Sequence, residues 1–226
     1  MKNIAIILAG GMGSRIGGDT PKQLLPLKDG KSVLEHSVEA FERAACITEI
    51  AIVMHPEWMD DAKALVARNN WRKVTKIIPG GSERWESSWF AIREYLKDEI
   101  KDDKTYLWFH DAARPFVSQD IIKRVAEGLK IYWAVTVAIP VTDTLYQIQG
   151  DKVADIPDRK GFMRAQTPQA FHFAVIGAAY MRAIEKGHIQ ATDDVGILMK
   201  YNPEIEVQVV EGEEENRKIT YIEDLK

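Results

Sequence analysis

Short apolar runs alternate with amphipathic segments along the chain, and this alternation constrains the fold more than any other feature of the sequence. Continuous apolar runs of strand length are typical of strands that are buried on both faces of a sheet. Strands that alternate with helices predict an α/β fold, here a Rossmann-like, three-layer α/β/α domain with a mostly parallel sheet. The runs are Ile4–Leu8, Glu49–Met54, Val74–Ile78, Tyr106–Phe109 and Val135–Ile139.

The segments between these runs carry helix signals. Ser32 and Glu35 have the spacing of a capping box, in which each side chain satisfies a backbone N–H group at the start of a helix. Apolar residues recur every three or four positions from Trp85 to Leu96, so we expect both of these residues on the buried face of one helix. Further helices are expected over residues 119–129 and 173–186.

Charge and cysteine content exclude several classes of protein. The chain has 30 basic and 34 acidic residues, a net charge of −4, which argues against a protein that coats nucleic acid. No apolar stretch approaches the ~20 residues of a membrane span. Cys46 is the single cysteine, so an intramolecular disulfide and a multi-cysteine metal site are both ruled out. We expect one soluble, cytoplasmic domain over residues 1–226 that binds neither nucleic acid nor membrane.

A glycine-rich loop, Gly10–Arg15, follows the first predicted strand, where ligands bind in parallel sheets. It matches neither the dinucleotide fingerprint nor the P-loop, because Ile16 replaces the last glycine of the first and Asp19 replaces the lysine of the second. The loop offers exposed backbone and two cations, Arg15 and Lys22, which suit a triphosphate. An ordinary turn with solvated charges explains the loop alone equally well.

The loop is the first of several sequence blocks that occur in a fixed order and cover most of the chain. Together they closely resemble the 2-C-methyl-D-erythritol 4-phosphate cytidylyltransferase family and its relatives, the ribitol 5-phosphate cytidylyltransferases. The blocks are Leu8-Ala9-Gly10-Gly11-x-Gly13-x-Arg15-Ile16 with Pro21-Lys22-Gln23, Gly80-Gly81-Ser82-Glu83-Arg84-x-x-Ser87, His110-Asp111-Ala112-Ala113-Arg114-Pro115, Pro140-x-x-Asp143-Thr144, Gln166-Thr167-Pro168-Gln169-x-Phe171, Thr192-Asp193-Asp194, Glu211-Gly212 and Asn216-x-Lys218-Ile219-Thr220.

The resemblance implies a nucleotidyltransferase that transfers CMP from CTP to an alditol phosphate and releases pyrophosphate. A phosphate monoester is already anionic, so catalysis requires positioning and cationic stabilisation of charge. Two acceptors remain open. His110–Arg114 and Pro140–Thr144 favour methylerythritol phosphate, used in isoprenoid precursor synthesis by the non-mevalonate route, whereas Leu8–Gly11 favours ribitol 5-phosphate, used in teichoic acid or capsule synthesis. A hexose-phosphate enzyme and a catalytically silent nucleotide-binding module are weaker alternatives.

The resemblance also assigns roles to individual residues. The catalytic residues are Arg15, Lys22 and Lys218. The nucleotide-binding residues are Ala9, Gly10, Gly11, Gly13, Gly80, Gly81, Ser82, Arg84, Ser87, Asp111, Ala112 and Arg114. The substrate-binding residues are Asp143, Thr144, Arg159, Thr167 and Lys218. Asp111 is expected to anchor Mg²⁺ beside CTP, since Mg²⁺ takes one or two carboxylates plus substrate phosphates. An ion pair with Arg114 or a helix cap is the alternative for Asp111, and His110 is expected to orient the Asp111 loop.

Residues 143–161 interrupt the strand–helix alternation. Gly150-Asp151 separates two β-prone stretches and predicts a hairpin arm. In the resembled family such arms cross a dimer interface and carry an arginine, here Arg159, to the partner's site, so the resemblance implies a homodimer with composite sites. Asp193 and Asp194 are expected to cap a helix, in preference to binding metal.

Overall fold

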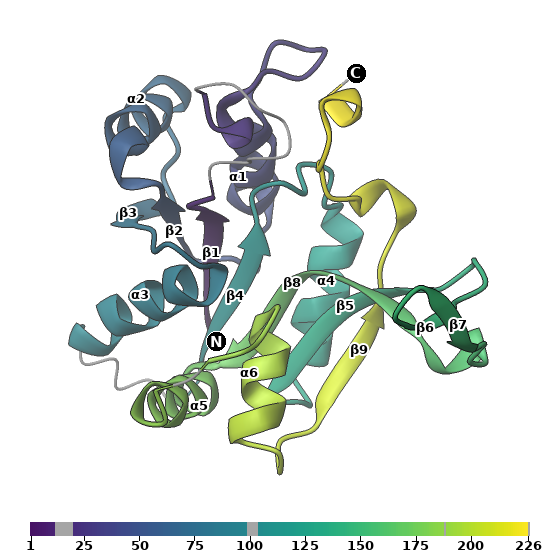
Figure 1. The fold of residues 1–226 in the computed structure, drawn as a ribbon. Coiled ribbons are helices and arrows are strands. Elements are labelled where there is room, and N and C mark those ends of the chain that lie inside the picture. Colours follow the sequence, from purple (N-terminus) through teal and green to yellow (C-terminus); the bar gives the residue numbers. More distant parts are fainter. Residues whose placement is uncertain (12–19, 99–103, 188, 226) are drawn as a thin grey trace.

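The computed structural model describes residues 1–11, 20–98, 104–187 and 189–225. Its main feature is a seven-stranded sheet of order β3-β2-β1-β4-β8-β5-β9 (Figure 1). Strand β8 runs antiparallel to both of its neighbours, and the other neighbouring pairs are parallel, so the predicted mostly parallel sheet is confirmed. The strands are β1 (Lys2–Ala9), β2 (Glu49–Met54), β3 (Val74–Pro79), β4 (Thr105–Asp111), β5 (Ala134–Pro140), β8 (Met163–His172) and β9 (Val207–Glu211).

Helices cover both faces of the sheet, which confirms the three-layer α/β/α arrangement. Alternate residues of β1 point to opposite layers: Ala5 and Ile7 pack in one core cluster, and Ile4 and Ile6 in the other. One layer holds α1 (Val33–Arg43), α2 (Met59–Asn69) and α4 (Gln119–Gly128), and the other holds α3 (Arg84–Lys97), α5 (Phe173–Glu185) and α6 (Asp194–Tyr201). Short 3₁₀ turns occupy Lys22–Leu24, Pro56–Trp58, Arg159–Gly161, Glu214–Asn216 and Ile222–Leu225.

The structure corrects the sequence analysis at three elements. In α3 the buried face passes through Ser88, Ile92 and Tyr95, whereas Leu96 is exposed, because the helix turns Leu96 away from the sheet. Strand β8, which contains Pro168, was not predicted from the sequence. The strand accommodates this proline at a register shift, where a ladder donor is not required. Strand β9 was not predicted, since it lies at the sheet edge and its residues are only partly buried.

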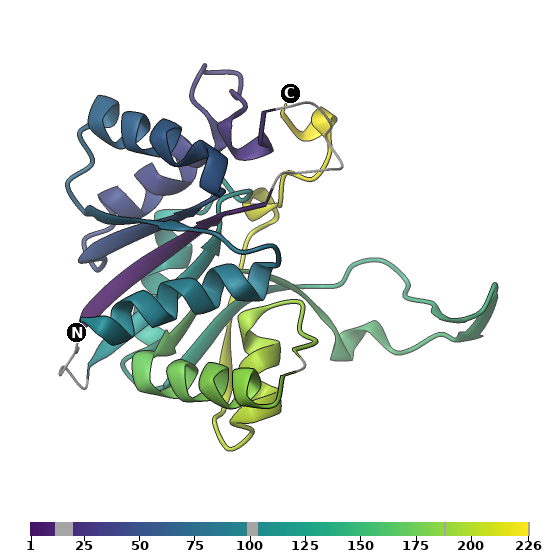
Figure 2. The same ribbon diagram turned by 60° about the vertical axis from the view of Figure 1, so that its left-hand side comes forward.

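The predicted hairpin arm is confirmed. Strands β6 (Gln147–Gln149) and β7 (Lys152–Asp155) pair antiparallel, and Gly150 has a positive φ in the turn between them. Figure 2 shows the arm extending well away from the sheet and its helices. All residues of β6 and β7 are exposed, so within the described structure these two strands pair with each other and are not covered by the rest of the domain.

A search for membrane spans among the described residues finds no helix with the length and apolar character needed.

The capping box at α1 is confirmed and extends into a buried polar cluster. Glu35 accepts hydrogen bonds from the backbone N–H and the hydroxyl of Ser32, and also from Arg68 and Asn69 of α2. Burial alone would raise the pKa of Glu35, but these hydrogen bonds lower it to about 2. The ionised carboxylate therefore joins α1 to α2.

We predict that Glu35→Gln lowers the free energy of unfolding at pH 7 by about 1–3 kcal/mol, because it replaces an ionised acceptor within a satisfied network. The folded-state pKa lies below the unfolded value, so this contribution is complete above about pH 4.5 and is lost as the pH falls toward 2. Urea unfolding at pH 7, 5 and 3.5 measures the difference, which should shrink with pH. Glu39→Gln on the same helix is the control, and an equal, pH-independent loss in both variants would contradict the prediction.

Candidate active site

A cavity of about 310 Å³ lies at the carboxyl ends of β1 and β4, between the loop after β3 and the C-terminal segment. Most of the nucleotide-binding residues expected from the sequence line it, together with both predicted catalytic lysines. These are Ala9, Gly10, Gly11, Lys22, Gly81, Ser82, Arg84, Ser87, Asp111, Ala112 and Lys218. Lining residues that the sequence analysis did not assign are Leu8, Gln23, Glu83, Ala113 and Thr220. The predicted residues Gly13 and Arg15 lie outside the described residues.

Close backbone contact between two loops shapes one wall of the cavity. A Cβ atom at Gly80 would lie 3.0 Å from the Cα of Gly10, so the loops that follow β1 and β3 can meet only without side chains there. Ser87, in the first turn of α3, accepts a hydrogen bond of 3.1 Å from the N–H of Gly81. Gly80 thus brings the two loops together and does not itself line the cavity.

Gln23 fixes the start of the glycine loop. Its side chain is buried, and Nε2 donates to the carbonyl oxygens of Ala9 at 2.5 Å and Gly11 at 2.9 Å. With these carbonyl groups held by Gln23, the start of the loop is fixed beside Lys22. The Pro21-Lys22-Gln23 block was noticed in the sequence, but only the lysine received a role, because nothing local indicates which carbonyl groups the amide meets.

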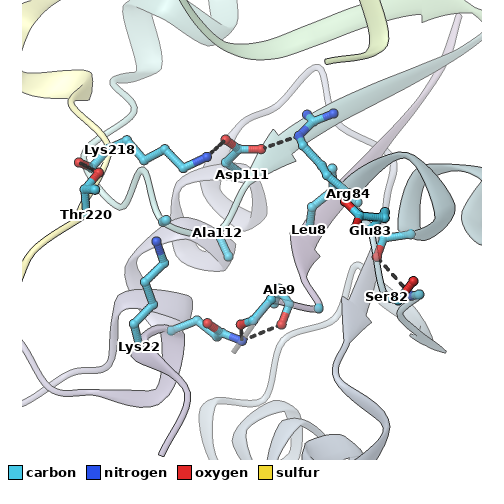
Figure 3. A pocket seen from close by; sticks show the side chains of 16 residues that line it. Leu8, Ala9, Lys22, Ser82, Glu83, Arg84, Asp111, Ala112, Lys218 and Thr220 are labelled. Atoms are coloured by element: carbon cyan, nitrogen blue, oxygen red, sulfur yellow. Dashed lines mark hydrogen bonds and ion pairs between the residues drawn. The ribbon is translucent and has the colours of Figure 1, made fainter. Parts of the chain in front are cut away.

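Asp111, the last residue of β4, lies between two cations (Figure 3). Its Oδ1 accepts a hydrogen bond of 3.0 Å from Nε of Arg84, and its Oδ2 accepts one of 2.7 Å from Nζ of Lys218. Burial by itself raises the pKa of Asp111, but Arg84 and Lys218 hold it well below its usual range. The carboxylate is therefore ionised, and its ion-pair partners are Arg84 and Lys218 in place of the neighbouring Arg114.

A network of buried hydrogen bonds holds the backbone of Asp111 in place. The backbone N–H of Asp111 donates to Oγ1 of Thr167 at 3.1 Å, and Thr167 in turn contacts Nδ1 of His110 at 3.0 Å. His110 Nε2 lies 3.0 Å from the carbonyl oxygen of Arg114, which can only accept, so Nε2 carries the proton and Nδ1 accepts from Thr167. Burial lowers the pKa of His110 to about 4, which keeps the ring neutral. His110 thus orients the Asp111 loop, as expected.

Thr167 and Arg114, two of the predicted ligand-binding residues, also lie outside the cavity lining. Thr167 is buried within the network below Asp111. The guanidinium group of Arg114 donates to the carbonyl oxygens of Asn216, at 2.8 Å, and Ala165, at 3.2 Å. These contacts hold the segment that leads to Lys218. Both residues therefore position the groups that line the cavity.

The C-terminal segment closes one side of the cavity. Nζ of Lys22 donates to the carbonyl oxygen of Ile219 at 2.9 Å, and the N–H of Ile219 donates to the carbonyl oxygen of Ala113 at 2.8 Å. These bonds place Lys22 and Lys218 on the same cavity. Of the charged side chains that line it in the described structure, Lys22, Arg84 and Lys218 outnumber Glu83 and Asp111, so the site favours an anion.

The pair Asp193 and Asp194 divides into two roles. Asp193 accepts a hydrogen bond of 2.9 Å from the N–H of Gly196 and caps α6, as expected. Asp194 is buried and forms an ion pair with Arg84 at 2.7 Å, which the sequence analysis missed because the two residues are far apart in the chain. Within the described residues no group of three or more His, Cys, Asp or Glu side chains could hold a metal ion.

The predicted acceptor-binding residues of the arm do not join the cavity. Asp143, Thr144 and Arg159 are exposed, and the guanidinium group of Arg159 contacts the carbonyl oxygen of Thr142 within the arm. The arm extends away from the site in Figure 2. One chain thus brings together most of the residues expected to bind nucleotide, with Lys218, and leaves the expected acceptor-binding residues Asp143, Thr144 and Arg159 outside.

Comparison with known proteins agrees with this arrangement. The family model for 2-C-methyl-D-erythritol 4-phosphate cytidylyltransferase matches residues 3–226. The enzyme of that name from Thermobifida fusca is 42% identical over 226 residues, 98% of this chain and 89% of its own. The bifunctional ribulose 5-phosphate reductase/CDP-ribitol pyrophosphorylase of Haemophilus influenzae is 40% identical over 226 residues, covering 99% of this chain and 47% of its own.

Solved structures give the same result. The 4-diphosphocytidyl-2C-methyl-D-erythritol synthase of Anaerococcus prevotii superposes with a TM-score of 0.81 at 27% identity, covering 99% of this chain and 94% of its own. The 2-C-methyl-D-erythritol 4-phosphate cytidylyltransferase of Thermus thermophilus superposes with a TM-score of 0.74 at 30% identity, covering 98% and 94% of the two chains. The chain therefore belongs to the 2-C-methyl-D-erythritol 4-phosphate cytidylyltransferase family.

Proposed function

We propose that the protein transfers CMP from CTP to 2-C-methyl-D-erythritol 4-phosphate, giving CDP-methylerythritol and pyrophosphate for isoprenoid precursor synthesis. The observation that carries this proposal is the cavity itself, in which glycine backbone, two lysines and Arg84 surround the ionised Asp111. Membership of the family supports the same reaction.

The chemistry follows from these groups. A phosphate oxygen of the acceptor attacks the α-phosphorus of CTP, and the bond from that phosphorus to the leaving pyrophosphate oxygen breaks. The nucleophile is already anionic, so no general base is needed. Lys22 and Lys218 supply positive charge where negative charge increases, and the loop Ala9–Gly11 offers backbone to the triphosphate. We assign Arg15, in the same loop, to the triphosphate by family resemblance.

Asp111 fits the anchor of a single magnesium ion. Mg²⁺ takes one or two carboxylates together with substrate phosphates, and Asp111 presents one ionised carboxylate at the cavity. When bound there, Mg²⁺ neutralises phosphate charge. Arg84 and Lys218 keep Asp111 ionised but also pair with both of its oxygens, so a bound Mg²⁺ would share the carboxylate with these two cations.

We also propose that the enzyme works as a homodimer. The arm exposes apolar side chains, among them Tyr146, Ile148 and Ile156, which a single chain leaves uncovered. A partner chain that covers the arm would bring Arg159 and Asp143 to a second cavity. We place the enzyme in the cytoplasm, the compartment that supplies a nucleoside triphosphate such as CTP.

Ribitol 5-phosphate remains the second candidate acceptor, because the Haemophilus influenzae relative is named for CDP-ribitol synthesis and is similar over the whole of this chain. Pyrophosphate release with CTP, UTP, ATP and GTP against both acceptors separates the candidates. We expect CTP with methylerythritol phosphate to give the highest kcat/KM. Faster turnover with ribitol 5-phosphate would reverse the assignment of the acceptor, and no release with CTP on either would reject the cytidylyltransferase.

Substitution of Lys22 tests the stabilisation of charge. We predict that Lys22→Ala lowers kcat by roughly 10²- to 10³-fold, the effect of removing one donor from a charge-stabilising site, and Arg15→Ala should do likewise. The measurement is pyrophosphate release at saturating substrates, with circular dichroism to confirm the fold. Lys63→Ala, which removes an exposed lysine that pairs with Asp60 on α2, is the control. Unchanged turnover in Lys22→Ala would contradict the assignment.

A mixing experiment tests the composite site. Arg159→Ala and Lys22→Ala should each be nearly inactive as homodimers. If Arg159 acts in the partner's cavity, each heterodimer contains one intact site, and an equimolar mixture after subunit exchange recovers about one quarter of wild-type activity. If Arg159 serves its own chain, every site in the mixture carries a substitution and the mixture stays inactive.

A further inference from the structure

Asp194 is a buried carboxylate whose position requires an explanation beyond the cap of α6. It is fully buried, and its Oδ1 accepts a hydrogen bond of 2.6 Å from the hydroxyl of Tyr180. Its Oδ2 accepts one of 2.7 Å from Nη1 of Arg84. A buried carboxylate is costly unless it is paired and hydrogen-bonded, and here Tyr180 and Arg84 each supply a partner to one oxygen of Asp194.

Arg84 lies between two carboxylates that come from different parts of the fold. Nε meets Asp111 at the end of β4, at 3.0 Å, and Nη1 meets Asp194 at the start of α6. Two contacts on different nitrogens fix both the position and the plane of a guanidinium group. The third nitrogen, Nη2, is buried and has no hydrogen-bond partner among the described residues. The guanidinium group is therefore held by two anchors while part of its donor capacity remains unused.

The two anchors differ in what else they do. Asp111 also pairs with Lys218 and faces the cavity, whereas Asp194 lies outside the lining and, among the described residues, pairs with Arg84 alone. An anionic nucleotide in the cavity competes with Asp111 for Arg84 and Lys218. Asp194 is the anchor that such a ligand does not reach. It can thus hold Arg84 in the same position whether or not the cavity is occupied.

We propose that Asp194, held by Tyr180, is a positioning residue for nucleotide binding that acts through Arg84. It fixes Arg84 at the cavity wall, and Arg84 in turn keeps Asp111 and Lys218 at the spacing that the nucleotide meets. The identity of the nucleotide as CTP rests on the proposed function.

The chain provides a matched control beside Asp194. Asp193 accepts hydrogen bonds from the N–H of Gly196, at 2.9 Å, and from Nε2 of Gln169, at 2.7 Å. It caps the same helix, but it makes no contact with Arg84 in the described structure. Asp193→Ala therefore removes the cap of the helix without removing the proposed positioning contact.

Calorimetric titration with CTP tests the proposal, together with thermal unfolding of each variant. We expect Asp194→Asn to raise the Kd for CTP about tenfold and Tyr180→Phe to raise it about threefold, within the usual range for groups coupled in one network. Asp193→Ala should lower Tm and leave the Kd within about twofold of wild type. In the Arg84→Ala background, Asp194→Asn should cause no further loss of affinity, because the residue through which it acts is gone.

Two results would overturn the proposal. One is an Asp194→Asn variant that lowers Tm as Asp193→Ala does and binds CTP as wild type. The other is a loss from Asp194→Asn that is undiminished in the Arg84→Ala background. If Asp194→Asn does not fold, the same comparison is made with Tyr180→Phe. Wild-type protein that binds a different nucleoside triphosphate contradicts the proposed function alone, and that nucleotide then replaces CTP in the series.

Discussion

The pairing of Asp111 with Arg84 and Lys218 is the interaction on which the rest of the site depends. It joins the end of β4, the start of α3 and the C-terminal segment at a single carboxylate. Each contact satisfies a group that burial would otherwise penalise, so removal of either cation leaves Asp111 partly uncompensated in a poorly solvated position. The three segments are therefore held together by ion pairs as well as by their connection to the sheet.

Several residues near Asp111 fix the position of its carboxylate. Thr167 accepts a hydrogen bond from the backbone N–H of Asp111 and donates one to His110, and the other ring nitrogen of His110 donates to the carbonyl oxygen of Arg114. Arg114 holds the segment that carries Lys218. Residues expected to touch ligand, such as Thr167 and Arg114, instead hold the residues that line the cavity. This arrangement suits a reaction whose barrier falls by positioning and fixed charge, since fixed groups need no reorganisation when charge develops.

The sequence predicts the fold where a segment's own pattern determines its environment. The inner strands β1, β2 and β4 contain the uninterrupted apolar runs Ile4–Ala9, Ile50–Met54 and Tyr106–Phe109 because both faces of the sheet are covered there, and a capping box marks α1. The pattern fails at β9, an edge strand whose residues are half-buried or exposed, and at β8, which contains Pro168, so neither strand was predicted, although the other edge strand, β3, was. For the site, too, the sequence predicts only what a local pattern determines. A glycine loop and an aspartate at strand ends predict the cavity, but the partner of Asp111 was sought in nearby Arg114 and found in Arg84, which only the tertiary fold brings close.

The net charge of −4 and an anion-binding cavity are compatible because the fold concentrates cations from separate segments at one point. The same consideration distinguishes the residues expected to bind nucleotide from those expected to bind the acceptor. The residues expected to bind nucleotide lie at or near strand ends of a single sheet, where the hydrogen bonds between strands fix their positions. Asp143 and Arg159 are exposed on an arm that extends away from the sheet, where the guanidinium group of Arg159 contacts the carbonyl oxygen of Thr142. An acceptor site that includes them needs a second surface to hold the arm. The proposed homodimer would supply that surface, whereas most of the residues expected to bind nucleotide are brought together within one chain.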